Sequence, residues 1–279
     1  RINPTLNRML SSSFSGHRNY MRKLSDLMGD AEAMKNFGNT MVVWDFHSRR
    51  PLQVLEVPGA PLEIRWALAP DAEYAFTSTA LTSKLWGVFR LPDGRFEAVE
   101  IGTIGDPSKI PLPVDISITA DGEGLWVNTF MDGTTRYFDL SNPEAPKQTY
   151  EKVTGKQVNM VSQSWDGKRV YITSSLLANW DKKGDSDEQF LRAFNWDGKE
   201  LTPVFEVDFY KLKLGRAHHM KFTARPTAKD IASTVPPALV AQRRVAAAAN
   251  RSFAVPTCPT RWRSRWKRPR AAKTLRSAF

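Results

Sequence analysis

The stretch Thr119-Ala120-Asp121-Gly122-Glu123-Gly124-Leu125-Trp126-Val127 places a tight turn directly before a short apolar strand. Asp-Gly between alternating apolar runs is the strongest short-range signal of a β-hairpin, because Gly adopts the backbone conformation that such turns need. A similar turn occurs at 69–72, before Tyr74–Phe76, and at 164–167, before Val170–Ile172. The aspartates of the three turns are spaced by 50 and 45 residues. The chain therefore contains an internal repeat.

The second half of the repeat is a pair of short strands around an aromatic residue and a turn. It occurs four times, at Met41–Asp45 with Leu52–Val57, Leu85–Phe89 with Phe96–Ile101, Arg136–Asp139 with Gln148–Glu151, and Leu191–Asp197 with Val204–Phe209. Two hairpins in about 45 residues are typical of one four-stranded propeller blade. A β-sandwich also predicts evenly spaced hairpins, but not a recurring unit of two. We therefore predict an all-β fold over 39–222, a partial β-propeller of about three and a half blades.

The predicted propeller is preceded by a polar lead-in over 1–38. Within it, apolar residues at helical spacing predict one helix over Asn19–Phe37, which Gly38 ends. A fourth inner hairpin is expected to begin at His218. Because a ring needs roughly four to eight blades, we expect this chain to be a fragment of a longer protein. The aromatic side chains predicted to pack between blades are Trp126, Phe138, Tyr171 and Trp196.

Composition changes abruptly near the end of the chain. Of the 40 Lys and Arg residues, 14 lie after Met220, against only one of the 29 acidic residues, Asp230. Residues 1–220 therefore hold 26 basic and 28 acidic side chains, whereas all of the excess positive charge lies beyond them. All 16 glycines lie at or before Gly215. We interpret 223–279 as a disordered or aberrant tail from a shifted reading frame, with an Ala-rich helix over Ala238–Ala249 compatible with its composition.

The tail also contains Arg261–Arg268, in which tryptophans alternate with cations. This pattern suits stacking on bases and neutralisation of phosphates. The Ala runs, scattered prolines and absence of glycine instead favour a tail that arises from a shifted reading frame. We therefore do not expect nucleic acid as a partner. The single cysteine, Cys258, also lies in the tail. Cysteine content therefore does not indicate whether the protein resides in an oxidising or a reducing compartment. We expect the periplasm, with the cytoplasm as the alternative, and no membrane partner because no run of 18 apolar residues occurs.

Histidine is the only residue type whose placement points to a site. The chain has four, His17, His47, His218 and His219, and no nucleophilic elbow, phosphate loop, dinucleotide fingerprint or zinc spacing accompanies them. His17 and His47 are expected to lie on the surface. His218 and His219 are adjacent, and neighbours in a strand point to opposite faces, so both bind one metal only if a bulge or loop intervenes. In a strand, one of the two would be buried or functional and the other exposed. From the residues alone, a structural role is the favoured hypothesis for the pair.

Several longer strings resemble the selenium-binding protein family, whose bacterial members include copper-dependent methanethiol oxidases. They lie at Phe37–Asp45, Val57–Arg65, Val114–Ser117, Asp166–Leu176 and Trp180–Lys182. The ending Arg216–Phe222 is similar to the closing segment of the bacterial members. The resemblance covers about 10–222, and the chain continues for dozens of residues beyond it.

The resemblance implies that a small thiol, methanethiol, is oxidised by O2 to an aldehyde, hydrogen sulfide and hydrogen peroxide at a copper centre. His218 and His219 are the copper ligands that the resemblance implies in this chain, because imidazole suits copper. The remaining ligands are expected outside this sequence, so the chain alone should be a poor oxidase. The matching region has no cysteine, so selenium binding is not argued. The alternative is a non-catalytic propeller that binds a protein partner, and an oligomer is compatible with either hypothesis.

Overall fold

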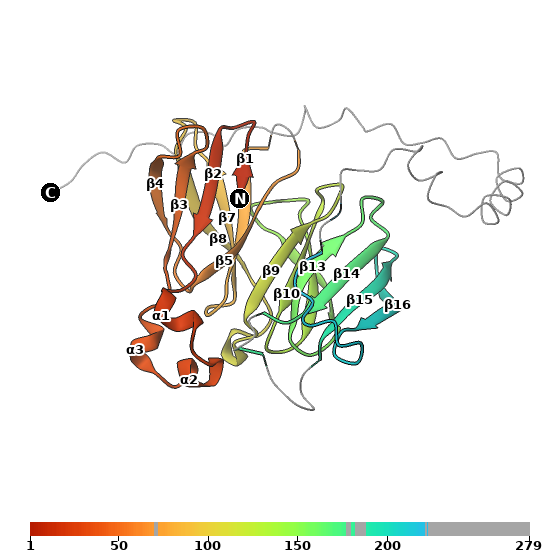
Figure 1. The fold of residues 1–279 in the computed structure, drawn as a ribbon. Helices are drawn as coiled ribbons and strands as arrows, with labels where there is room; N and C mark the ends of the chain where they lie inside the picture. Colours follow the sequence, from red (N-terminus) through yellow and green to blue (C-terminus); the bar gives the residue numbers. More distant parts are fainter. Residues whose placement is uncertain (70–71, 177–179, 182–187, 221, 223–279) are drawn as a thin grey trace, which may run out of the picture. The chain divides into compact units, whose positions relative to one another are not determined.

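The computed structural model describes residues 1–69, 72–176, 180–181, 188–220 and 222. The chain divides into a unit Arg1–Arg225 and a unit Pro226–Phe279, and all of the described residues belong to the first. Their strands form four antiparallel four-stranded sheets in chain order, from the red β1–β4 to the blue-green β15 and β16 in Figure 1. This is the blade arrangement of a partial β-propeller. No helix among the described residues is long and apolar enough to cross a membrane.

Each sheet is a meander in which consecutive strands pair. The first sheet contains β1(Ile2–Asn3), β2(Arg8–Ser12), β3(Thr40–Asp45) and β4(Pro51–Glu56). The second contains β5(Pro61–Trp66), β6(Tyr74–Thr79), β7(Lys84–Arg90) and β8(Phe96–Thr103). The third contains β9(Pro113–Ile118), β10(Gly124–Thr129), β11(Thr134–Asp139) and β12(Lys147–Val153). The fourth contains β13(Val158–Gln163), β14(Arg169–Ser174), β15(Phe190–Trp196) and β16(Leu201–Asp208).

The repeated turn has the same hydrogen bonds in two sheets. Before β10, Asp121 accepts from the backbone N–H of Glu123 at 3.0 Å, and Gly122 has φ of +80°, which a residue with a Cβ rarely adopts. Before β14, the corresponding Asp166 accepts from the N–H of Lys168 at 3.1 Å. The third copy of this turn includes residues 70 and 71, which lie outside the described residues. The sequence signal for these hairpins is therefore local turn chemistry.

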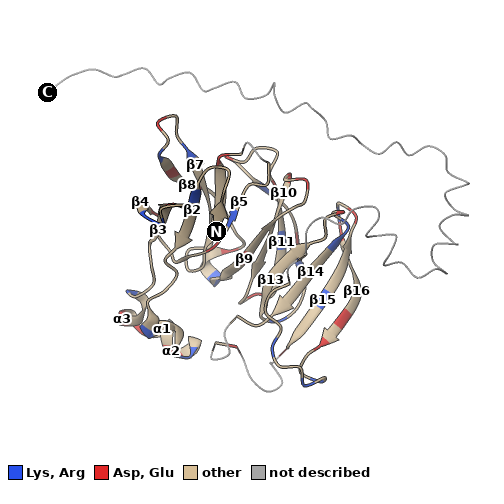
Figure 2. Cartoon of the chain, turned by 45° about the horizontal axis from the view of Figure 1, so that its top comes forward, with Lys and Arg blue, Asp and Glu red and all other residues tan. Residues whose placement is uncertain are grey.

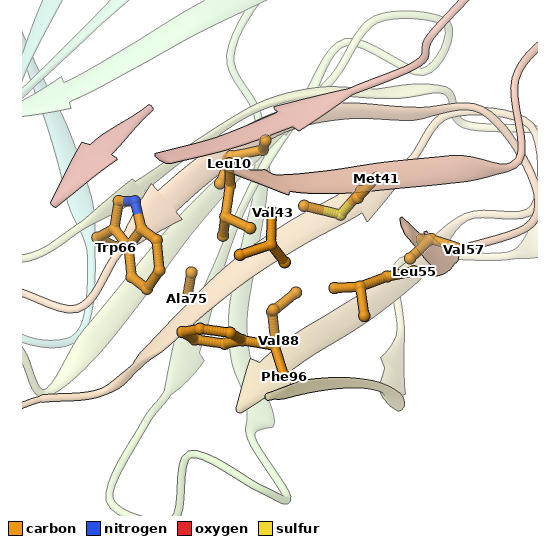
Figure 3. Close-up of a cluster of buried hydrophobic side chains, with 10 residues drawn as sticks. Leu10, Met41, Val43, Leu55, Val57, Trp66, Ala75, Val88 and Phe96 are labelled. Carbon is orange, nitrogen blue, oxygen red and sulfur yellow. The ribbon is translucent and has the colours of Figure 1, made fainter. Parts of the chain in front are cut away.

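Successive sheets are held together by apolar side chains. In the cluster shown in Figure 3, Leu10, Met41 and Val43 of the first sheet pack against Trp66 and Phe96 of the second. Similar clusters join the second sheet to the third and the third to the fourth. Successive residues of an inner sheet therefore face different neighbours, as the period of two requires: Ala75 of β6 lies in the cluster with the first sheet and Phe76 in the cluster with the third.

Trp126 on β10 is the largest side chain that is fully buried. Its ring centroid lies 4.8 Å from that of Trp196 on the fourth sheet, and Phe138 is buried between the second and third sheets. These placements confirm the predicted packing for all but one of the four aromatic residues. Tyr171 lies on the opposite face of β14 and contacts Phe205 of its own sheet, because its neighbours on the strand, not Tyr171 itself, occupy the intersheet positions.

The prediction of one helix over Asn19–Phe37 is wrong. Lys23 has extended backbone with ψ of 145°, and Asp30 accepts from the N–H groups of Glu32 and Ala33 at 2.9 and 3.1 Å. A new helix therefore begins after Lys23 and another after Asp30, at positions where the apolar spacing alone predicted one continuous helix. The result is α1(His17–Tyr20), α2(Leu24–Met28) and α3(Ala31–Met34), which lie together beyond one end of the first sheet in Figure 1.

Two further expectations about the sheets change. The segment 1–38 contributes β1 and β2 to the first sheet, so the described part holds four sheets in place of about three and a half. A strand of two residues is too short to show alternation, which is why β1 escaped detection. The fourth inner hairpin expected from His218 is also wrong, because residues 209–220 and 222 form no strand. The tail over 223–279, with its helix at Ala238–Ala249, lies outside the described residues.

Burial of Trp126 gives a direct test of the packing between the third and fourth sheets. We expect Trp126→Ala to lower the free energy of unfolding by about 3–5 kcal/mol, because it removes a large side chain and leaves a cavity. Tyr210→Ala, at a side chain that is 63% exposed, should change it by less than about 0.5 kcal/mol. Denaturant unfolding of the full chain measures both. Equal effects of the two substitutions would contradict this assignment of the core.

Candidate functional site

The two histidines proposed as metal ligands lie on the segment that follows β16, and both side chains are exposed. The backbone around them is held by hydroxyl groups of the fourth sheet. Thr173 Oγ1 on β14 donates to the carbonyl oxygen of His218. Ser162 Oγ on β13 donates to the carbonyl oxygen of Met220 at 2.9 Å. These side-chain bonds replace the strand ladder that the sequence predicted here.

The start and the end of this segment are anchored as well. Arg216 forms an ion pair with Asp181, whose side chain is completely buried. Asp181 also accepts from Ser175 Oγ at 2.6 Å and from the N–H of Leu176 at 2.9 Å. At the C-terminal end of the segment, the ring of Phe222 packs on the ring of Tyr171, with the ring centroids 5.3 Å apart. The described residues of the segment are therefore held at both ends and at two carbonyl groups between them.

The structure does not bring further ligands to this pair within the part that it describes. His17 on α1 and His47 after β3 are exposed and lie on other elements, as expected for surface residues. No group of three or more His, Cys, Asp or Glu side chains among the described residues is arranged to hold a metal ion. The fit to copper is therefore partial. Two imidazoles are the right donors, but they make an incomplete set.

A second polar arrangement joins the inner strands, the name we give to β1, β5, β9 and β13, the first strand of each sheet. Arg65 Nη2 on β5 donates to Asp115 Oδ1 on β9 at 2.9 Å. The other carboxylate oxygen, Oδ2, accepts from the N–H of Val161 on β13 at 2.8 Å. Glu63 bonds both to Arg65 and to the guanidinium of Arg1, beside β1. Residues from all four sheets thus form one line of charges and hydrogen bonds.

Burial dominates the electrostatics of this line. The side chain of Asp115 has no exposed surface, and burial raises its pKa to about 6 despite the opposing effects of Arg65 and of the N–H of Val161. Burial likewise lowers the pKa of Arg65, which the charge of Asp115 opposes. A carboxyl with such a pKa gains and loses its proton near neutral pH. Because both of its oxygens are already bonded to protein, its role among the described residues is to join the inner strands.

Sequence reasoning missed Arg65 and Asp115 although a signal was present. Both lie inside strings that carried the resemblance, as charged residues within otherwise apolar alternation. They are 50 residues apart, which is one repeat, so the blade pattern places them at matching positions on neighbouring inner strands. Arg65 pairs with Phe76 and shares its face of the second sheet, so it points toward the third sheet, where Asp115 accepts its hydrogen bond.

Cavities do not single out another site. One of about 340 Å3 is lined by residues that include Asp132, Lys156 and Glu188, and one of about 410 Å3 lies beside Arg192 and Phe205. His218 and His219 line neither of them. Acidic and basic residues are interspersed over the strands in Figure 2, and the side chains around both cavities are of mixed charge. The histidine segment therefore remains the candidate site for chemistry.

Comparison with known proteins gives a consistent result. The family of 56 kDa selenium-binding proteins matches residues 2–232. The chain is 61% identical over 230 residues to a methanethiol oxidase of Hyphomicrobium, covering 82% of this chain and 53% of that protein. It is 61% identical over 216 residues to a methanethiol oxidase of Ruegeria pomeroyi, covering 77% and 50%. Selenium-binding protein 2 of mouse is 27% identical over 249 residues, covering 70% and 52%. The chain thus spans about half the length of these relatives.

Among solved structures, a hypothetical selenium-binding protein of Sulfolobus tokodaii superimposes with a TM-score of 0.63 at 24% identity. The match covers 75% of this chain and 54% of that one. At this identity the likeness shows the fold alone. It agrees with the arrangement of blades described above.

The raised pKa of Asp115 predicts a pH dependence of stability. In the folded chain Asp115 holds its proton up to about pH 6, whereas in the unfolded chain it loses it near pH 4. Between these values the folded state binds more protons, so its stability falls as the pH rises. Asp115→Asn removes this dependence on pH. The free energy of unfolding of the variant minus that of wild type should therefore increase as the pH rises from 4 to 7, by at most about 3 kcal/mol.

Denaturant unfolding of both chains at pH 4.5, 6 and 7.5 measures the difference. Asp93→Asn, at an exposed turn with a lowered pKa, serves as the control and should not produce a change in this window. A difference between wild type and Asp115→Asn that is constant with pH would contradict the assignment.

Proposed function

Because this chain belongs to the family of 56 kDa selenium-binding proteins, we propose that it forms part of a methanethiol oxidase. The observation that carries the proposal is its high identity to relatives named methanethiol oxidase in two bacteria. Since the chain spans about half of their length, the activity belongs to the longer protein of which such relatives are examples. The histidine segment is this chain's contribution to it.

The proposed reaction consumes one methanethiol, one O2 and one water. It releases formaldehyde, hydrogen sulfide and hydrogen peroxide, and this set of products balances in atoms. Carbon is oxidised to the level of an aldehyde, sulfur leaves as sulfide, and O2 accepts the two electrons. Methanethiol and O2 are thus the small-molecule partners that we propose.

We propose copper as the cofactor. When bound, it supplies one-electron exchange between a thiol and O2, chemistry that no side chain provides. Of the described residues, His218 and His219 are the donors that suit it, and the lack of a third donor nearby means that other ligands complete the set. In this chain the residues of the fourth sheet hold the backbone of the pair, while the line of charges from Arg1 to Asp115 joins the inner strands of all four sheets.

A second candidate function is a propeller that binds a protein partner without catalysis. The exposure of both histidines and the lack of a three-donor group in the described part favour it. The two functions differ in one measurable property, specific binding of copper at His218 and His219.

We therefore expect the purified chain to bind copper weakly and to be a poor oxidase. Binding should be lost in the double variant His218→Ala with His219→Ala, because no group of three or more metal-binding side chains occurs among the described residues. It should persist in the matched variant His17→Ala with His47→Ala, which removes the same number of imidazoles elsewhere. Copper titration of the full chain measures this.

The activity is measured by methanethiol consumption and peroxide release after copper loading, with the Hyphomicrobium relative as reference. Turnover equal to that of the reference would contradict the incomplete ligand set. Equal copper binding by the two double variants would remove the ligand assignment and leave the binding platform as the better hypothesis.

A further inference from the structure

The contacts to the histidine segment come from one face of the fourth sheet. Ser162 on β13 is directly opposite Tyr171 on β14 in the strand register, and Thr173 lies two residues further along β14. Because alternate residues of a strand share a face, all three side chains lie on the same side of the sheet. The other side carries Val170 and Ile172, which pack in the core with Trp126. The segment 216–222 therefore covers the face turned away from the third sheet.

The two hydroxyl bonds are placed on either side of His219. Thr173 binds the carbonyl oxygen of His218, and Ser162 binds that of Met220. Both carbonyl groups are thus held toward the face of the sheet that carries Thr173 and Ser162. With both carbonyls fixed, the backbone dihedrals between them are restricted, and so are the directions in which the side chains of His218 and His219 leave the chain.

Beyond these bonds, contacts at both ends anchor the segment. Ala217 is only 6% exposed, and the ion pair of Arg216 with the buried Asp181 precedes it. Phe222 packs on Tyr171 at the other end. The anchors hold the segment on the sheet, while the two hydroxyls act only on the backbone between the anchors. Removing a hydroxyl should therefore change the local geometry of the histidines without releasing the segment.

We propose that Thr173 and Ser162 are positioning residues for His218 and His219, which they hold in the geometry that binds copper. The proposal rests on the proposed function, because it takes the two histidines to be ligands. Groups that hydrogen-bond the side chain of a metal ligand typically contribute about 10–100-fold to affinity. Thr173 and Ser162 act on the backbone instead, so we expect an effect at the lower end of this range. Neither hydroxyl needs to touch the metal for this effect.

The test uses the full chain and Cu(II) as the probe. Thr173→Val removes the hydroxyl at nearly constant volume, Ser162→Ala removes the other, and Thr173→Ser keeps a hydroxyl in place. Thr202→Val, at an exposed position on β16 of the same sheet, is the matched control. We expect affinity for Cu(II) to fall by roughly tenfold in Thr173→Val and in Ser162→Ala, with a changed electron paramagnetic resonance spectrum, and to be kept in Thr173→Ser and Thr202→Val.

A second measurement needs no copper. Trypsin cleavage after Arg216 in the copper-free chain reports release of the segment from the sheet. We expect its rate in both hydroxyl variants to remain within about twofold of wild type, because the anchors remain, whereas Asp181→Asn should raise it several-fold. If copper affinity and the spectrum change while cleavage is no faster, the positioning role is supported. If copper binding weakens in proportion to faster cleavage, the positioning role is overturned, because detachment of the segment then explains the loss.

The outcomes separate this proposal from the one on which it rests. If His218→Ala with His219→Ala leaves Cu(II) binding unchanged, the ligand assignment fails and the positioning role fails with it. If that variant loses binding while Thr173→Val and Ser162→Ala bind as wild type, only the positioning role is overturned. If Thr173→Val does not fold, as judged by far-ultraviolet circular dichroism, Ser162→Ala decides the outcome, because Ser162 is only partly buried.

Discussion

Asp115 accepts one hydrogen bond from β5 and another from β13 while fully buried on β9. Three of the four inner strands therefore meet at one carboxylate, and Glu63 extends the line to Arg1 beside β1. Burying this charge is costly, as the raised pKa of Asp115 shows. The cost is offset only when the partners stand at the right distance. A slip of one inner strand along its neighbour would leave a buried charge without its partner, which proteins tolerate poorly.

The apolar contacts between sheets have a different role. They fill the space between neighbouring blades with side chains such as Trp126 and Phe138, and they supply most of the free energy that favours the folded state. Apolar contacts are not directional, so they do not by themselves fix how far one sheet is shifted against the next. The directional bonds at Asp115 add that restriction, and we regard their contribution to specificity of register as a hypothesis for this protein.

The histidine segment depends on the same sheet architecture. The fourth sheet has one face in the core and another to which no further described sheet is added, and 216–222 lies on that second face. The carbonyl oxygens of His218 and Met220 accept from side chains of β14 and β13 in place of a neighbouring strand, as partly buried carbonyls require. This leaves the imidazoles exposed. This exposure is compatible with the proposal that the two histidines bind copper together with other ligands.

The sequence by itself determined the class of fold and the hairpins of the repeat between residues 40 and 208, because turn chemistry and alternation are local and recur in every blade. Residue type and a family resemblance also led to the prediction of His218 and His219 as copper ligands, and this stays a prediction. Only the tertiary structure decided that 1–38 adds two strands to the first sheet, that Tyr171 faces away from the core, and that Arg65 and Asp115 meet. Most of these outcomes depend on partners about 30 to 50 residues distant, such as Asp45 for Arg8, Phe205 for Tyr171 and Asp115 for Arg65. The division of the predicted helix has a local cause that apolar spacing does not reveal, the cap at Asp30. A periodic pattern specifies which face a side chain occupies, but what lies opposite that face is decided by the packing of the whole unit.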